Sequence, residues 1–213
     1  MFYATDQHHG LPHDPFKSCI VPRPIGWLTT LDGQGRVNLA PFSFFNGIAS
    51  DPPLVIAGIN GAPPPNGMKD TLANCRETGE FVVNMATWDL REAMNLTSAD
   101  VPSDVDEMVL AGLTPAPSEL VKPPRVAESP IHMECRIHDI LDMPCTLEGS
   151  RNTMIIGQVV GIHIDDSVLT DGLIDMAKVR PIARLGYMDY TVVNEVFTMR
   201  RPTAEQAMKG AAE

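Results

Sequence analysis

Short apolar segments separated by turn-forming residues dominate the first part of the chain and predict antiparallel strands. Residues 25–31 and 37–40 flank the turn 32–35, and an Asp-Gly pair between short apolar runs is a strong hairpin signal. The unbroken apolar run at 54–59 is too short for a helix. Such a run is typical of a central strand that is covered on both faces.

A short helix is predicted directly after a proline-rich loop. Residues 61–67 contain three prolines in succession, which remove backbone donors and exclude regular structure. In the segment 69–78 that follows, Asp70 or Thr71 is the expected N-cap, and Gly79 is placed to end the helix. The start of this helix is therefore free to meet an anion.

The rest of the chain alternates strands with short excursions. A strand is expected at 81–85, and the spacings Asp89 to Glu92 and Asp104 to Glu107 fit capping boxes that open two further short helices. The proline-rich stretch 113–130 is interpreted as a surface excursion. Later elements are an alternating, half-buried strand at 132–140, a long strand at 153–164 with Gly157 as a bulge or close-approach point, and a frayed or weakly helical tail from Thr203.

About seven strands with helices as short insertions, and no strand–helix alternation, favour a mainly β fold built as a closed antiparallel barrel. The 19 prolines and 16 glycines agree with many turns. A chain of 213 residues can bury one substantial core, so a single domain over 1–213 is expected.

Charge and segment patterns exclude several classes of partner. The 27 acidic and 16 basic residues give a net charge of −11, which repels phosphate backbones and anionic lipid, so no nucleic acid partner is expected. No signal-peptide pattern opens the sequence, and no apolar run approaches the roughly 20 residues that span a bilayer. A cytoplasmic protein without a membrane partner is expected. The four cysteines are widely spaced and are interpreted as reduced, mostly structural thiols.

Candidate chemistry concentrates in residues 38–46. The glycine-rich nucleotide motifs and the G-x-S-x-G nucleophile motif are absent from the sequence. Residues 38–46 combine small, polar and aromatic side chains that can offer donors and a flat surface to a polar ring. From composition alone, an aromatic-rich strand that fills the core is the commoner interpretation.

The residues resemble those of a known family. Arg23-Pro24-Ile25-Gly26-Trp27, residues 35–46, Asp51-Pro52-Pro53-Leu54-Val55 and residues 69–74 are similar to the flavin reductase-like FMN-binding split barrels, and residues 181–186 with Tyr190 resemble the closing segment of that family. The resemblance covers about 19–190, and four ordered motifs make coincidence improbable. It implies a split β-barrel, with Greek-key-like connections and short inserted helices, that forms a homodimer and binds one FMN non-covalently in each of two clefts near the subunit interface.

The resemblance also implies the residues that bind FMN. Asn38, Ala40 and the run Ser43, Phe44, Phe45 and Asn46 would border the flavin ring and ribityl chain, Lys69 and Thr71 would hold the phosphate, and Arg23 and Thr29 are weaker candidates. A lysine and a hydroxyl at a helix start supply what a phosphate requires. Without the resemblance, Lys69 would be interpreted as a solvated charge and Arg23 as an ion-pair partner.

Other polar side chains are given no role in the chemistry. Arg184 lies in a segment near the C-terminal end of the barrel and is interpreted either as a flavin contact or as a residue that stabilises the dimer. The structural role is favoured. His163, Asp165 and Asp166 are residue types that bind metals, and they lie close together in the sequence. A single histidine on a strand accounts for the pattern equally well, so no metal is assigned. No catalytic side chain is expected either, because the hydride chemistry belongs to the flavin.

The family implies an NAD(P)H-dependent flavin reductase that passes electrons to oxygen, free flavin or a partner oxygenase. One departure weakens the nicotinamide assignment: many relatives carry a Gly-Asp-His motif on a late strand, where residues 157–159 here read Gly-Gln-Val. NADH or NADPH therefore stays a possible co-substrate. A flavoredoxin-like electron carrier that docks a redox protein, a non-catalytic flavin-binding module and a barrel without cofactor remain alternatives.

Overall fold

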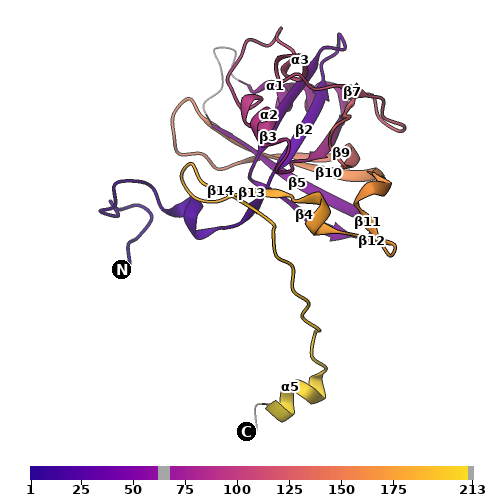
Figure 1. Cartoon of the computed structure of the whole chain (residues 1–213). Helices are drawn as coiled ribbons and strands as arrows, with labels where there is room; N and C mark the ends of the chain where they lie inside the picture. The colour runs from indigo at the N-terminus through magenta and orange to yellow at the C-terminus, as the bar shows by residue number, and fades with distance from the viewer. Residues whose placement is uncertain (62–67, 211–213) are drawn as a thin grey trace.

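A computed structural model describes residues 1–61 and 68–210 and has a seven-stranded antiparallel sheet as its main element (Figure 1). Along the sheet the strand order is β3-β2-β6-β9-β10-β5-β4. These strands are β2 (Gly26–Leu31), β3 (Val37–Phe42), β4 (Phe45–Ser50), β5 (Pro53–Gly61), β6 (Glu80–Met85), β9 (Ile131–Met143) and β10 (Arg151–Ile164). The first and last strands in this order, β3 and β4, are joined by Ser43 and Phe44 alone. The sheet therefore curls so that β3 and β4 approach each other at this connection, although the two strands are not paired in the described residues, which makes it a split barrel.

Smaller elements surround the barrel. β1 (Arg23–Pro24), β13 (Ile182–Arg184) and β14 (Tyr190–Val192) form a three-stranded sheet, and two short hairpins pair β7 (Pro115–Ala116) with β8 (Arg125–Val126) and β11 (Leu169–Thr170) with β12 (Leu173–Ile174). The helices are α1 (Asp70–Thr78), α2 (Arg91–Leu96), α3 (Glu107–Leu110), α4 (Met176–Val179) and α5 (Ala204–Gly210), with 3-10 turns at Phe16–Cys19 and Asp166–Val168. The mainly β split-barrel fold predicted from the sequence is confirmed.

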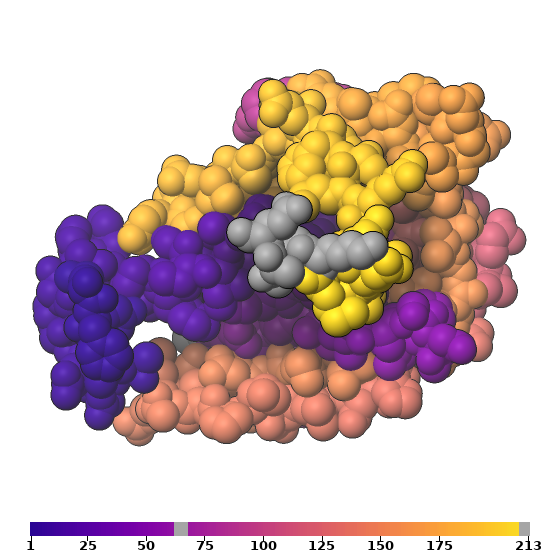
Figure 2. Space-filling view, turned by 90° about the horizontal axis from the view of Figure 1, so that it is seen from below, coloured from indigo at the N-terminus to yellow at the C-terminus, as the bar shows by residue number. Residues whose placement is uncertain are grey.

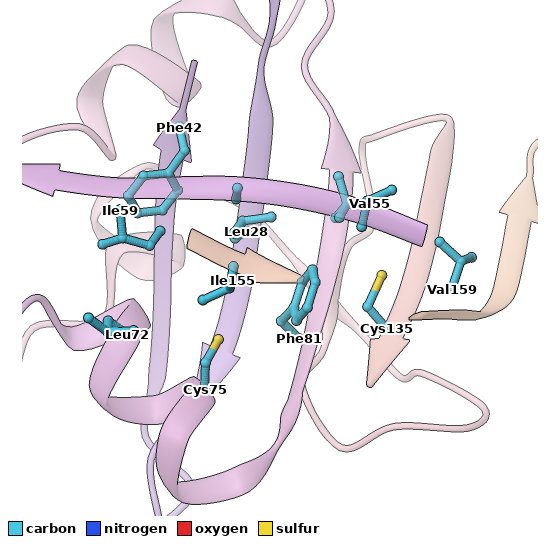
Figure 3. Packing of buried hydrophobic residues seen from close by; sticks show 12 residues of the cluster. Leu28, Phe42, Val55, Ile59, Leu72, Cys75, Phe81, Cys135, Ile155 and Val159 are labelled. Carbon is cyan, nitrogen blue, oxygen red and sulfur yellow. The ribbon is translucent and has the colours of Figure 1, made fainter. Parts of the chain in front are cut away.

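The barrel interior is an apolar cluster contributed by strands from across the sheet. Leu28, Val55, Phe81 and Ile155 pack together there, and Leu72 from α1 packs against this cluster (Figure 3). Phe81 is accommodated because a glycine faces it: a Cβ on Gly157 would lie 2.2 Å from Phe81 Cζ. The strand register also shifts between Ile156 and Gly157, so both expectations for this glycine are confirmed.

A second apolar cluster covers the opposite face of β2 and β3. Trp27 and Leu39 from these strands pack with Met94 of α2, Met108 of α3 and Ile182 of β13. The indole Nε1 of Trp27 donates to Thr97 Oγ1 at 2.9 Å, which satisfies the one polar atom of this fully buried side chain. This layer fixes α2 and β13 beside the barrel.

The predicted helix ends require corrections. Helix α1 exists, with Gly79 in the left-handed region at φ +73°, but its N-cap is Lys69, neither Asp70 nor Thr71. Helices α2 and α3 exist as well, yet the N-cap of α2 is Leu90 and no side chain caps it, so the expected capping box is not formed. For α3 the capping carboxylate is that of Asp106. Of these helices, only α3 is preceded by two acidic candidates, Asp104 and Asp106, and tertiary packing decided that Asp106 takes the cap position.

Strand β5 also differs from the expected strand. It pairs with β10 and β4, but only alternate side chains are buried, namely those of Val55, Ala57 and Ile59. The intervening Ile56 and Gly58 lie on a half-buried face. The apolar run therefore has one face in the core and one at the molecular surface, where it lines a cleft described below.

The proline-rich excursion is held to the barrel by a buried carboxylate. Glu134 on β9 is 0% exposed and accepts hydrogen bonds from the backbone N–H groups of Glu119, Leu120 and Val121 at 2.8, 2.6 and 3.2 Å. His163 Nε2 lies 2.5 Å from the same carboxylate. The alternating sequence of β9 predicted that Glu134 lies on the polar face of the strand. In the structure the excursion covers this face, and the alternation of residues along the strand gives no sign of that.

His132 adds a neutral imidazole to this region. Its Nε2 lies 2.8 Å from the carbonyl oxygen of Val126, so Nε2 carries the proton, and Nδ1 is buried without a partner among the described residues. Burial lowers the pKa of His132 from 6.5 to about 4.

This shift predicts an acid-sensitive fold. The unfolded chain binds a proton at His132 that the folded chain does not, so the free energy of unfolding falls from pH 6.5 to pH 4 by up to about 3 kcal/mol. Urea unfolding of the protein and of His132→Gln across this range checks the difference. Parallel pH profiles for the two proteins would contradict it.

The chain leaves the barrel after β14 and ends in α5, away from the main sheet (Figure 1). From below, this C-terminal segment crosses in front of the barrel, and the first residues project to one side (Figure 2). Val196, Phe197 and Met199 in the segment are 65–81% exposed. No helix in the described part of the chain is long and apolar enough to cross a membrane.

Candidate functional site

Two neighbouring clefts contain nearly all the residues singled out from the sequence. We call the first the helix cleft: it lies at the start of α1 and is lined by Asn38, Ala40, Lys69 and Thr71, together with residues 97–101 and Glu107. The second, the β4 cleft, has a volume of about 520 Å³ and is lined by Arg23, Ser43, Phe44, Phe45 and Asn46, with Ile20, Ile56, Gly58, Asn60, Asn152 and neighbouring residues.

One segment of chain joins the two clefts. Residues 40–42 at the end of β3 line the helix cleft, and residues 43–46 at the start of β4 line the β4 cleft. Four residues span at most about 14 Å when fully extended. One elongated ligand with a polar end and a flat end can therefore reach both clefts.

The helix cleft presents free donors and one cation. Lys69 precedes α1, and no side chain among the described residues caps this helix, so the first backbone N–H groups stay available to an anion. Thr71 is buried, and its hydroxyl oxygen accepts a hydrogen bond from Asn38 Nδ2 at 2.9 Å. Because that bond occupies a lone pair, the Thr71 proton is left to donate to a ligand.

A buried polar network fixes Asn38 in this position. Asn38 Nδ2 also lies 3.2 Å from Thr30 Oγ1, which accepts from Asn74 Nδ2 at 3.0 Å. The network ties β2, β3 and α1 together beneath the cleft. Asn38 therefore positions Thr71, a role that the sequence pattern did not assign to it.

Carboxylates share the helix cleft with Lys69. Asp70 accepts a hydrogen bond from Ser103 Oγ at 2.8 Å. Glu107 is 7% exposed and accepts from the backbone N–H of Leu39 at 3.0 Å. Burial raises the pKa of Glu107.

The β4 cleft suits a flat, largely apolar group. Its floor includes Ile56 and Gly58 on the outward face of β5, and Phe44 lies beside Gly58. A Cβ on Gly58 would lie 3.0 Å from Phe44 Cβ, so a larger residue would press on the aromatic wall. The apolar run at 54–59 was the signal for this floor, but an unbroken run predicts burial of both faces, and the structure buries only one.

Arg23 is anchored by the chain itself. Its guanidinium donates to the carbonyl oxygens of Ile20 and Leu185, both at 2.8 Å, and to that of Lys17. No carboxylate lies within ion-pair distance among the described residues, so the ion-pair interpretation does not hold. Arg23 lines the β4 cleft, but its Nε is buried and has no partner in the described chain.

Thr29 lies apart from both clefts. It is 0% exposed, and its hydroxyl accepts a hydrogen bond from Asn84 Nδ2 at 2.8 Å. Asn84 also bonds Trp27 and Val126, so this threonine belongs to a network that joins β2 and β6 to β8. Its neighbour Thr30, not singled out from the sequence, is the residue that supports the helix cleft.

Other candidate groups lie elsewhere. His163 contacts Glu134, and no three His, Cys, Asp or Glu side chains gather as metal ligands in the described residues. Cys75 and Cys135 are buried in the barrel core, and burial raises the pKa of the Cys75 thiol to about 12. Among the described residues that line the β4 cleft, none is a histidine or a carboxylate.

Known proteins resemble this chain over most of its length. A family model described as the flavin reductase like domain matches residues 18–183. The uncharacterized protein BH2278 of Halalkalibacterium halodurans is 39% identical over 188 residues, covering 88% of this chain and 89% of that protein.

Two solved structures are similar over most of the chain. Nitrilotriacetate monooxygenase component B from Bacillus cereus is 32% identical with a TM-score of 0.84, covering 93% of this chain and 98% of that one. The 2-nitrobenzoate 2-nitroreductase NbaA of Pseudomonas fluorescens is 28% identical with a TM-score of 0.77, covering 88% and 89%.

The chain belongs to the flavin reductase-like family. Family and fold together support a flavin-binding oxidoreductase.

Proposed function

We propose that this protein binds FMN across the helix cleft and the β4 cleft and acts as an NAD(P)H-dependent flavin reductase. The observation that carries the proposal is the continuous segment 40–46, which lines an anion-binding helix start at one end and a flat apolar cleft at the other. A mononucleotide flavin has a phosphate and a flat ring at its two ends. The single helix start fits one phosphate group, which favours FMN over a dinucleotide flavin.

Lys69 and Thr71 would hold the phosphate. The ammonium group supplies charge, the Thr71 hydroxyl supplies a directed proton, and the uncapped helix start supplies N–H donors. Asn38 would hold Thr71 in place from below. Ala40, between these residues and Ser43, leaves room for the chain that links the phosphate to the ring.

The β4 cleft would hold the flavin ring. Phe44 and the floor at Ile56 and Gly58 offer flat apolar contact, and Ser43 and Asn46 offer polar side chains. FMN, when bound, supplies two-electron redox chemistry, and the chain supplies binding, orientation and electrostatics. Because no acid or base lines this cleft among the described residues, the proposed reaction requires none from the protein.

An anaerobic visible spectrum of the purified protein, before and after NADH and then NADPH, tests the function. We expect flavin bands that bleach with one of the two nucleotides. Bands that persist with both would contradict nicotinamide dependence and favour the flavoredoxin-like carrier or the non-catalytic module. A protein that stays colourless after FMN addition would overturn flavin binding itself.

An electron carrier is the second candidate. The segment 157–159 places Gly157 against Phe81 in the barrel core, where it serves packing, and provides no histidine there. A carrier would take electrons from a redox protein, and the net charge of −11 suits a basic partner. A partner oxygenase is the corresponding acceptor for a reductase, as the name of the monooxygenase component B from Bacillus cereus suggests for that protein.

We propose further that the protein is a homodimer that covers strand β4. Within the described parts of the chain this strand pairs only with β5 in the main sheet, and residues 46–50 are exposed, which leaves an open edge beside the β4 cleft. Ile48 on this strand is 51% exposed. A second copy over β4 would cover the edge and close one side of the cleft.

Ile48→Asp is expected to shift the protein from dimer to monomer, because a carboxylate would lose its hydration in the interface. Light scattering after size-exclusion chromatography measures the mass. The matched control is Leu173→Asp, at a 72% exposed residue on the β11–β12 hairpin, which should leave the mass unchanged. A monomeric parent protein, or a dimeric Ile48→Asp variant, would contradict the proposed interface.

A further inference from the structure

A third cavity of the described chain lies outside the two clefts. It has a volume of about 610 Å³ and opens between α2 and the strands β13 and β14. Its floor contains Met94 and Ile182, and its walls contain Trp88, Arg91, Arg184 and Tyr190, with the amides of Asn95 and Asn194 at the rim. We call it the α2–β14 cavity. A space of this size accommodates a small organic ligand.

Arg184 gives the cavity a positive charge that the chain does not neutralise. Its guanidinium donates to the carbonyl oxygen of Tyr187 at 2.6 Å and to the hydroxyl of Tyr190, and no carboxylate lies within ion-pair distance among the described residues. Arg23 is its direct partner in the β1–β13 pairing and also lacks a carboxylate. Neither arginine has a carboxylate within ion-pair distance among the described residues, so an anion bound in the cavity would supply a counter-charge that the described chain does not.

The effect of Arg184 on its neighbour supports this view. The pKa of Arg23 is lowered by burial and by the positive charge of Arg184. Like charges at adjacent positions repel each other, and an anion bound at Arg184 would relieve that repulsion. The guanidinium has five N–H donors, and the contacts within the chain leave some of them available.

The second arginine of the cavity is held by an aromatic ring. Arg91 lies with its guanidinium carbon 4.1 Å from the ring centroid of Trp88 and donates to the Trp88 carbonyl at 2.7 Å. Its carboxylate contact within the described chain is with the exposed Glu92, at 3.5 Å. Stacking fixes the plane of the guanidinium. Its Nη1 is bonded to the Trp88 carbonyl and its Nε faces Glu92, which also lines the cavity, so Nη2 remains to bind a carboxylate or phosphate.

The aromatic walls suit a flat ligand. Trp88 and Tyr190 are each 37% exposed although both belong to the folded body of the protein. The guanidinium of Arg184 lies 4.5 Å from the Tyr190 ring centroid. A ring that enters above Met94 and Ile182 would bury apolar surface against both, while its anionic substituent meets the arginines.

We propose that the α2–β14 cavity is a second ligand site, which binds a flat aromatic anion through Arg184 and Arg91. The shared chemistry is an aromatic ring that carries a carboxylate or a phosphate. This class includes aromatic acids and nucleoside monophosphates. The site does not depend on FMN binding in the other two clefts.

Isothermal titration calorimetry with benzoate and with AMP, in the absence and in the presence of saturating FMN, tests the proposal, because FMN is itself a flat ring with a phosphate. We expect at least one of the two to bind with one site per chain. Benzoate alone would identify an aromatic acid site, and AMP alone would identify a nucleotide site. Cyclohexanecarboxylate, which lacks the aromatic ring, and benzamide, which lacks the charge, should each bind more weakly by about tenfold or more.

Tryptophan fluorescence locates the bound ligand. The chain has two tryptophans, and Trp27 is fully buried while Trp88 lines the cavity. A ligand in the cavity should therefore change the emission of Trp88, and Trp88→Phe should remove that response. Calorimetric binding without any change in emission would place the ligand elsewhere and contradict the proposal.

Charge variants test the two arginines. Arg184→Met should weaken binding about tenfold to hundredfold, because it removes charge-assisted hydrogen bonds, whereas Arg184→Lys should retain most of the affinity. Arg91→Gln provides a second test on a different element, should Arg184→Met fail to fold. Arg136→Gln, on β9, makes the same change in net charge away from the cavity and should bind as the parent protein does.

Further results would overturn the proposal. They are the failure of benzoate and AMP to bind, equal binding of benzamide and benzoate, and equal loss of affinity in Arg136→Gln and Arg91→Gln. None of these results bears on the FMN proposal, because the spectrum that tests FMN does not involve this cavity. The emission of Trp88 could also change with protein concentration and not on addition of anions. That result would contradict a ligand site and indicate a contact between chains.

Discussion

Glu134→Ala is expected to lower the free energy of unfolding by about 3–5 kcal/mol, the range for breaking a buried charged network. The side chain is fully buried and accepts three backbone hydrogen bonds from residues 119–121 together with one contact from His163. Alanine would leave those N–H groups without a partner and open a cavity beneath the excursion. Urea unfolding followed by circular dichroism measures the change.

Glu80→Ala is the matched control for this prediction. Glu80 binds the same excursion through a single contact, from the backbone N–H of Lys122 at 2.9 Å, and is only partly buried. Its removal should cost about 1 kcal/mol or less. Equal effects of the two substitutions would show that the excursion is not held by the buried carboxylate.

The same carboxylate should give the protein a second acid-sensitive step. Burial by itself raises the pKa of Glu134, but the hydrogen bonds from Glu119, His163 and Leu120 outweigh it and lower the pKa below its usual value. A group with a lowered pKa stabilises the fold above its unfolded pKa, and this stabilisation is lost as the pH falls through the folded pKa. The step therefore lies at lower pH than the one expected for His132 and should be absent in Glu134→Gln.

Removing both phosphate ligands, with Lys69→Ala and Thr71→Val together, is expected to weaken FMN binding at least a hundredfold. A hydrogen bond to a charged group contributes about 1.5–3 kcal/mol, and each tenfold change in affinity corresponds to about 1.4 kcal/mol. The two residues would contact one phosphate, so their effects need not add. Quenching of flavin fluorescence on titration with the protein measures the affinity.

Lys122→Ala and riboflavin serve as controls. Lys122 lies on the excursion, outside both clefts, and its removal changes the net charge equally. Riboflavin lacks the phosphate, so the double variant should bind it as the parent protein does. Unfolding measurements on each variant separate loss of binding from loss of fold, because Thr71 is buried and bonded to Asn38. Unchanged FMN affinity in a folded double variant would remove the helix cleft as the phosphate site.

Local signals in the sequence were sufficient for the hairpin and for α1. The turn 32–35 forms as expected, with Asp32 Oδ1 accepting from the backbone of Gln34 and Arg36, and Gly35 at φ +81°. Gly79 ends α1 in the left-handed region. These features depend on residues that are near neighbours in the chain, so short-range sterics and hydrogen bonding determine them.

The residues of the candidate site could be named from motifs, but their grouping could not. Lys69 and Thr71 lie some thirty positions from Asn38 in the sequence, yet α1 and β3 bring them together, while Thr29 faces away into another network. Which face of a strand is buried depends on what covers it. A threonine one position along a strand points to the opposite side, so a motif match alone cannot separate Thr29 from Thr30.

The sequence was sufficient to predict the mainly β class, the positions of most strands, the ends of the hairpin and the acidic charge. Each of these follows from composition or from contacts between near neighbours. Other features exist only in the folded chain: the outward face of β5 lines a cleft, Glu134 is buried under the excursion, and Arg23 and Arg184 stand side by side. Each of these depends on segments far apart in the chain. Burial and the pairing of charges are properties of the packed chain, and no local pattern encodes them.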